Sequence, residues 1–202
     1  MASSKRDQLI DTALTLFYRD GFHATGIDRI LAESGVAKMT LYKHFKSKDE
    51  LIEAALQKRM EAPRERMAWA LEHLPPRTAI LAVFEGLHGL LHEAEYHGCA
   101  FVNAAAEFHD RDHPIHRVAA SHKANAEAHF RTALERLEVA EPARLARQLQ
   151  YLLEGAITMA HIQGPGDQAL EAGAAAEVLL CAAGVPDPQA SMQPTVHRLP
   201  PK

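Results

Sequence analysis

The sequence predicts an all-α protein, and three observations carry this prediction. Ala and Leu dominate a composition that is 47% hydrophobic and only 6% aromatic, which is typical of helices. Runs of β-branched residues, which favour strands, do not occur in the 202 residues. Apolar residues recur at helical spacing in segments that Pro or Gly separates. We expect nine helices, three in a head and six in a body.

The first two helices of the head are expected over residues 5–20 and after Thr25. Asp20-Gly21 ends the first helix, which braces the other two. Thr25 can cap the second helix, with Asp28 three residues on, at the position of a capping-box acid. Gly35 then interrupts the apolar pattern, because it can take a positive φ and let the chain turn sharply.

A third, short helix is expected from Lys38 to about Phe45, with Leu41 and Phe45 facing inwards. Its outer side then carries cations, hydroxyls and a phenol, on Lys38, Met39, Thr40, Tyr42, Lys43 and His44. Ser47 is expected to cap the next helix, with Lys48 in its first turn. A cation in a first turn opposes the helix dipole, so Lys48 indicates an anionic partner.

Helix, a four-residue turn with Gly, and helix is the helix-turn-helix pattern that reads DNA. An αα-corner with a solvated basic face would show the same pattern. The order of residues separates the two, because SGVAKMTLYKHFKSKDEL resembles the recognition segment of the TetR family of one-component repressors, AGVSxGTLYxHFxSKExL. LIDTALTLFYRDGFHATGIDRIL resembles the family's first two helices. The resemblance covers the first quarter of the chain closely and the rest by layout.

The resemblance implies a double-stranded DNA operator as partner. Phosphate anchoring carries over to Thr25, Tyr42, His44 and Lys48, while Lys38, Met39, Thr40 and Lys43 lie where base edges or phosphates would come. Two residues depart from the family's pattern. Gly26 stands where the family often has a phosphate-binding Thr or Ser, and Met39 stands where it often has Gly. The thioether of Met39 could touch a thymine methyl.

Charge, hydropathy and cysteine content indicate the compartment in which the protein works. The net charge of −4 is uneven, since residues 1–60 hold 10 Lys or Arg against 8 Asp or Glu. No apolar run is long enough for a membrane span, and the N-terminus lacks a signal-peptide core. Two cysteines far apart do not resemble a disulfide framework. We therefore expect a cytoplasmic protein. Its predicted domains are a helix-turn-helix head (1–47), a ligand-binding and dimerisation body (48–185) and a Pro-rich, disordered tail (186–202).

The body's helices are expected between proline and glycine breaks. The first has Pro63 inside it, so we expect a kink or break near Ala62. The six expected ranges are 48–72, 77–96, 99–108, 114–138, 143–162 and 167–184. The last two offer more apolar surface than a small body needs, and in the family they form a four-helix bundle with their mates. We therefore expect a homodimer through Leu145, Leu149, Leu152, Leu153, Ala156, Ile157, Leu170, Ala174, Val178, Leu179 and Ala182.

Apolar side chains with a few polar groups among them give the middle helices the composition of a small-molecule pocket, although an ordinary core has the same composition. The family resemblance favours a pocket for a small-molecule effector. The residues expected to line it are Phe84, His88, Cys99, Asn103, Glu107, Phe130 and Tyr151.

Two alternatives remain for the trigger. The chain has 13 His, and His88/His92 and His109/His113 are spaced to share a divalent ion. Cys99, at a predicted helix start, could be a redox-sensing thiol. Solvated histidines and a buried thiol are the simpler interpretations, so no metal site is expected. No cofactor or enzymatic activity is expected either, because the chain has no GxSxG and no Gly-rich phosphate loop.

Overall fold

The computed structural model describes residues 4–187. Residues 188–202, most of the predicted tail, lie outside the described residues. Over the described part, the chain forms nine α-helices and no strand, as expected. They are α1 (Lys5–Asp20), α2 (Ile27–Ser34), α3 (Lys38–His44), α4 (Lys48–His73), α5 (Pro76–Leu91), α6 (Ala100–Glu107), α7 (Pro114–Arg136), α8 (Pro142–Gln163) and α9 (Gln168–Ala182).

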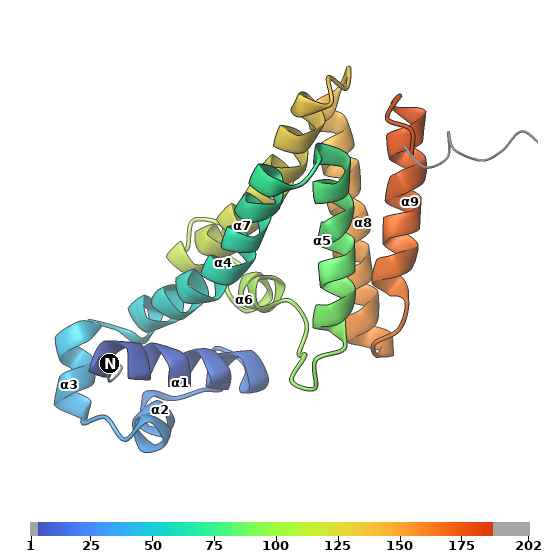
Figure 1. The fold of residues 1–202 in the computed structure, drawn as a ribbon. Helices are drawn as coiled ribbons and strands as arrows, with labels where there is room; N and C mark the ends of the chain where they lie inside the picture. Colours follow the sequence, from blue (N-terminus) through green and yellow to red (C-terminus); the bar gives the residue numbers. More distant parts are fainter. Residues whose placement is uncertain (1–3, 188–202) are drawn as a thin grey trace, which may run out of the picture.

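The helices divide into a head, α1–α3, and a body, α4–α9 (Figure 1). The head lies at one end of α4, which runs from it along the body and packs against α1 and α7. In the body α9 contacts both α5 and α8, and α7 contacts α8. The short α6 lies between the head and the long helices of the body (Figure 1).

Local sequence signals set most helix ends. The Ser4 and Ser47 hydroxyls cap α1 and α4 by accepting bonds from the backbone N–H groups of Asp7 and Glu50. Pro76, Pro114 and Pro142 each stand in a first turn, where a missing N–H costs nothing. The prolines therefore explain why the starts of α5, α7 and α8 were predicted to within a residue.

Two expectations for the body's helices were wrong. Of the kink or break expected near Ala62, the break does not occur, because α4 continues through Pro63 as one helix. α5 ends at Leu91 and not near Tyr96, because the segment that follows is held by tertiary contacts. The Tyr96 hydroxyl donates to the carbonyl of Ile157 on α8, 3.3 Å away, and the N–H of His97 donates to the Tyr18 hydroxyl on α1, 2.9 Å away.

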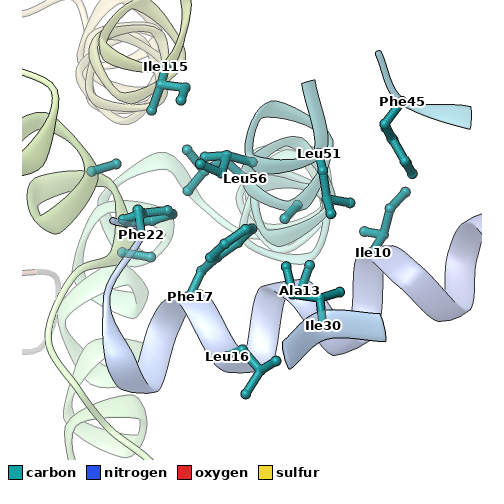
Figure 2. Packing of buried hydrophobic residues seen from close by; sticks show 14 of the residues in the cluster. Ile10, Ala13, Leu16, Phe17, Phe22, Ile30, Phe45, Leu51, Leu56 and Ile115 are labelled. Carbon is teal, nitrogen blue, oxygen red and sulfur yellow. The ribbon is translucent and has the colours of Figure 1, made fainter. Parts of the chain in front are cut away.

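Buried side chains form two hydrophobic clusters. The first joins the head to the body (Figure 2): Ile10 and Phe17 of α1 face Leu51 and Leu56 of α4, and Ile115 of α7 closes one side. Each fully buried Leu, Ile or Phe contributes roughly 2 kcal/mol by burial. Because α4, α6 and α7 all supply residues to this cluster, the head shares its core with the body.

The second cluster fills the body between α5, α7, α8 and α9. Phe84 of α5 and Phe130 of α7 stack at its centre with ring centroids 6.0 Å apart, and both are fully buried. Alanines such as Ala146 and Ala176 let the helices approach closely. The body is therefore tightly packed around its two central phenylalanines.

Candidate nucleic-acid interface

The turn between α2 and α3 has the geometry that its sequence predicted. Gly35 adopts a left-handed conformation with φ 63°, which a residue with a side chain rarely tolerates. Val36, Leu41 and Phe45 are 5% exposed or less and hold α3 against the first cluster. This burial compensates for α3 being too short to be stable alone.

The opposite side of α3 is open to solvent. Met39 is 80% exposed and Tyr42 48% exposed. Within the head, the ammonium of Lys38 lies 3.3 Å from the carboxylate of Asp28, but both side chains are largely exposed, so water competes with this pair. The solvent side of α3 carries Lys38, Met39, Tyr42, Lys43 and His44, with Thr40 partly covered. We call these six residues the α3 face.

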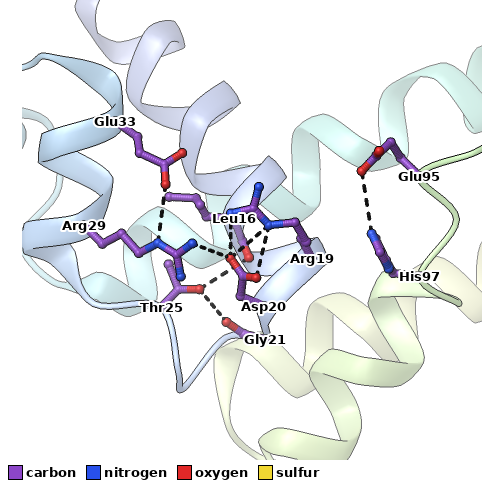
Figure 3. A network of polar contacts seen from close by, with 9 residues as sticks. All are labelled: Leu16, Arg19, Asp20, Gly21, Thr25, Arg29, Glu33, Glu95 and His97. Carbon is purple, nitrogen blue, oxygen red and sulfur yellow. Dashed lines mark hydrogen bonds and ion pairs between the residues drawn. The ribbon is translucent and has the colours of Figure 1, made fainter.

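Thr25 does not have the role that was predicted for it. Its side chain is fully buried, and its hydroxyl donates to the carbonyls of Gly21, at 2.8 Å, and Leu16, at 3.4 Å (Figure 3). The N-cap of α2 is Gly26, which has no side chain to cap with. Thr25 therefore closes the end of α1, and a phosphate contact by its hydroxyl would have to replace these bonds.

An ion-pair network holds α2 against α1 on the outside of the same corner. The Asp20 carboxylate lies 3.0 Å from Arg19 and 3.1 Å from Arg29, and Arg29 also pairs with Glu33 (Figure 3). The hydrogen bond from Arg19 lowers the pKa of Asp20. These side chains fix the angle between the bracing helix and the first helix of the motif.

Lys48 lies at the edge of the interface and contacts the protein itself. Its ammonium donates to the carbonyl of His23 in the α1–α2 turn, 3.2 Å away, and burial lowers its pKa. A phosphate contact by Lys48 would have to compete with this bond or share the ammonium. The cation in a first turn predicted an anionic partner, and in the structure it donates to a neutral backbone carbonyl.

Two cations near α3 were missed. The guanidinium of Arg6 on α1 lies 5.4 Å from the centre of the Phe45 ring, so α1 brings a positive charge to the end of α3. Lys46, just after α3, is exposed. The Lys5-Arg6 pair at the start of an amphipathic helix was the available signal, but only the fold shows that this end of α1 adjoins α3.

The residues predicted to line a ligand pocket are not brought together. Phe84 and Phe130 belong to the second cluster, whereas Cys99 packs against the first. Tyr151 is 68% exposed on α8, so its place in the predicted pocket is wrong for this protomer. A shallow, open cleft of about 350 Å³ lies elsewhere, between α4 and α7, lined by Glu53, Gln57, Met60, Pro114, Arg117, Val118 and Ser121.

Two polar residues of the predicted pocket have local partners, whereas the buried Nδ1 of His88 has none among the described residues. The Cys99 sulfur accepts from the Lys123 ammonium at 3.3 Å, and Lys123 pairs with Glu154 at 2.7 Å. The Asn103 amide donates to the carbonyl of His97. The ring of His88 lies beside that of His92, with centroids 4.4 Å apart and planes tilted by 54°. These contacts do not converge on one cavity.

Glu107 was also expected in the pocket and instead faces the head. Its carboxylate accepts from the backbone N–H groups of Phe22, at 2.9 Å, and His23, at 2.6 Å. Its place in a ligand pocket is therefore wrong. A single carboxylate at the end of an apolar helix gives no hint in the sequence that it will bind a turn 85 residues away.

The predicted dimer face is wrong at four of its eleven positions, all on α8, whereas Leu170, Ala174, Val178 and Ala182 on α9 are exposed. On α8 the side chains of Leu145, Leu149, Leu153 and Ala156 are 6% exposed or less and fill the body's own core. The large apolar residues that α8 and α9 leave exposed are Tyr151, Met159, Ile162, Leu170 and Val178. We call these five residues the α8–α9 face. Leu170 and Val178 were predicted for the dimer face, and the other three were not.

Two further observations concern the described residues as a whole. No group of three His, Cys, Asp or Glu lies close enough together between residues 4 and 187 to hold a metal ion. In the same part of the chain, none of the helices combines the length and apolarity that crossing a membrane requires.

Comparison with known proteins covers both halves of the chain. The family described as bacterial regulatory proteins, tetR family, matches residues 9–55, and the family of LmrA/YxaF-like transcriptional regulator C-terminal domains matches residues 76–176. SCO4454, a TetR-family transcriptional regulator from Streptomyces coelicolor, is similar in structure with a TM-score of 0.83. It is 30% identical, over 89% of this chain and 95% of its own.

Two curated relatives extend the comparison. The HTH-type transcriptional regulator YjdC of Escherichia coli is 25% identical over 157 residues, which are 76% of this chain and 82% of that protein. The HTH-type transcriptional repressor KstR2 of Mycolicibacterium smegmatis is 38% identical over 55 residues, which are 27% of each chain.

Proposed function

Because this chain belongs to the TetR family of DNA-binding transcriptional regulators, we propose that it is a homodimeric repressor that releases its operator when a small molecule binds the body. The α3 face is the observation that carries the proposal. An α-helix fits the major groove of B-DNA, and this short helix presents only side chains that a groove can accept. Its buried side anchors it firmly to the head.

The residues of the α3 face divide into two roles. Lys43, His44 and Tyr42 can donate to phosphates, which supplies affinity without sequence preference. Met39, at 80% exposure the most prominent side chain of the helix, can contact a thymine methyl and so contribute to specificity. Lys38 and Thr40 stand beside Met39, where they can reach base edges. The exposure of these groups supports a DNA contact by α3 itself.

We expect a dimer because the α3 face is small. One helix of seven residues reads too few base pairs for useful specificity, so two copies are needed. The α8–α9 face supports this, because Ile162 is 70% and Val178 68% exposed, which is costly for large apolar side chains left in water. We infer that each copy covers the α8–α9 face of the other.

Release by a small molecule requires the body to change. Phe84 and Phe130 are fully buried and stacked, so an effector that enters there selects a state in which this core is open. The ligand need only prefer the state whose two heads are wrongly spaced for successive major grooves. Continuity of the first cluster from the body into the head supports such coupling.

The proposal is tested by the salt dependence of binding to the duplex upstream of the protein's own gene. Tyr42→Phe combined with Lys43→Ala should weaken binding and reduce the slope of log K against log salt by about 1, because the loss of the Lys43 charge releases about one counterion fewer, while the neutral Tyr42 hydroxyl contributes affinity alone. Arg144→Ala removes an exposed cation from the body and is the matched control. An unchanged slope in the double variant would reject a DNA contact by the α3 face.

One contact favours a second candidate trigger, oxidation of a thiol. The half-buried Cys99 sulfur lies 3.3 Å from the Lys123 ammonium, and reactive cysteines occur beside cations. If this trigger operates, hydrogen peroxide should release DNA from the wild type and from Cys181→Ser, but not from Cys99→Ser. An equal response of both serine variants would exclude it.

A further inference from the structure

The short helix α6 belongs to the body, yet it contacts the head at both of its ends. Just before α6, the Tyr18 hydroxyl of α1 donates to the Gly98 carbonyl at 2.9 Å and accepts from the N–H of His97 at 2.9 Å. At the other end, Glu107 reaches the turn between α1 and α2. The last turn of α1 is therefore fastened to α6 at two points.

Glu107 contacts the turn through both carboxylate oxygens and through its backbone carbonyl. Its two carboxylate oxygens accept from the N–H groups of Phe22 and His23, at 2.9 and 2.6 Å, and its backbone carbonyl lies 3.1 Å from Nε2 of the His23 ring. A carboxylate that accepts two backbone bonds is held more strongly than a neutral acceptor. The turn is thus held mainly through its main chain, with one further contact from the His23 ring.

The shape of the turn is matched to this carboxylate. Gly21 has φ +93°, and a Cβ atom there would lie 3.2 Å from Oε1 of Glu107, closer than a side chain normally approaches. The ring of His23 also lies against Phe108, the residue after Glu107, with centroids 4.7 Å apart. Both the backbone conformation and the side chains of the turn therefore fit α6.

The turn leads directly into the DNA-reading motif. Three residues after His23, Gly26 is the N-cap of α2, and between them Thr25 bonds back to α1. From the other side, the Lys48 ammonium of α4 donates to the His23 carbonyl at 3.2 Å. Its charge also faces Glu107, whose carboxylate acts against the lowering of the Lys48 pKa by burial. The start of α2 is thus held between α6 and α4.

We propose that Glu107 is a positioning residue for DNA binding: from α6 of the body, it fixes the α1–α2 turn and through it the orientation of α2 and α3. This inference rests on the proposed function. A head whose turn is released samples orientations that do not fit the groove, and operator affinity falls with the fraction of heads in the fitting orientation. Glu107 itself contacts no DNA in this account.

The test measures binding of the full-length protein to the duplex upstream of its own gene. Glu107→Ala should weaken binding about tenfold, since the binding-competent fraction falls, and Glu107→Gln should weaken it less because one acceptor oxygen remains. The slope of log K against log salt should stay at the wild-type value, because no phosphate contact is lost. Asp112→Asn removes an exposed carboxylate that pairs only with Arg117 among the described contacts, and it is the matched control.

Amide hydrogen exchange on the same proteins separates positioning from folding. In Glu107→Ala, exchange should rise in the peptide that contains Phe22 and His23 and stay at the wild-type level in α4 and α7. Wild-type affinity in Glu107→Ala, or increased exchange throughout α4 and α7, would overturn the inference. Failure of the wild type and of Asp112→Asn to bind any DNA would instead reject the proposed function on which it rests.

Discussion

His122 on α7 is a histidine that the fold keeps neutral. Its ring stacks on Phe101 with centroids 3.7 Å apart and planes 12° from parallel, and its buried Nδ1 has no partner among the described residues. Burial, with smaller effects from the charges of Lys123 and Arg59, lowers its pKa from 6.5 to about 4. A proton added to this ring would therefore cost stability.

The pH dependence of unfolding should show this cost. Between pH 6.5 and about 4 the unfolded chain binds a proton at His122 that the folded chain does not, so stability falls as the pH falls through this range. The loss is at most about 3 kcal/mol. Urea unfolding of His122→Asn should show a flatter dependence than the wild type, with His109→Asn as the matched control. Equal slopes in all three proteins would contradict this account of His122.

At the scale of residues, the sequence predicted whether a side chain is buried or exposed better than it predicted which element that side chain contacts. Leu41 and Phe45 were correctly placed inside and Met39 and Tyr42 outside, because one helical period decides all four. The predicted N-cap role of Thr25 and the predicted pocket position of Glu107 were wrong because the oxygen of each side chain can bind more than one partner. Which partner it binds depends on the element that packs against it. Tyr151 was placed inside as an aromatic residue, but its position on α8 faces away from the core.

At the scale of elements, α2 lacks the side-chain N-cap that α1, α4 and α7 have. Its N-cap is Gly26, with φ −83° and ψ 156°, which are ordinary values for a capping serine. A Cβ atom at this position would meet nothing within 4 Å. The chain therefore leaves the first N–H groups of α2 to solvent, or to a phosphate of bound DNA.

Gly26→Ser should stabilise the protein. A hydroxyl cap together with a less flexible unfolded chain is worth about 0.5–1 kcal/mol, which corresponds to a rise of about 1–4 °C in Tm for a chain of this size. The same replacement at Gly35, which has φ 63°, should lower Tm instead, because a side chain there is strained. Calorimetry of the two variants tests the pair, and a lower Tm for Gly26→Ser would show that the cap site is not free.

At the scale of elements, helix starts were predicted more accurately than helix ends. Pro76, Pro114 and Pro142 mark their starts in any context. The end of α5 was placed about five residues late, because nothing local stops a helix at Leu91. The segment after it leaves the helix so that His97 and Gly98 can bond to Tyr18, and a contact across 80 residues leaves no local signal.

For the whole molecule, the account requires two copies. The number of helices and their division into head and body were predictable from periodicity, whereas the register of the α8–α9 face was not, because both sides of α8 carry apolar residues.

Ile162→Glu should yield a monomer in analytical ultracentrifugation, since a carboxylate in a covered apolar face is costly. Arg117→Glu, at a 64% exposed side chain on α7 away from this face, is its control. A dimer that survives Ile162→Glu would place the interface elsewhere.

The central claim is that a paired molecule sets two α3 helices into successive major grooves. Hydroxyl-radical footprinting of the full-length protein on the duplex upstream of its own gene tests this most directly. Two protected patches should appear on one face of the duplex, with centres separated by one or more helical turns of about 34–36 Å each. A single protected patch, or no protection at any protein concentration, would contradict the claim.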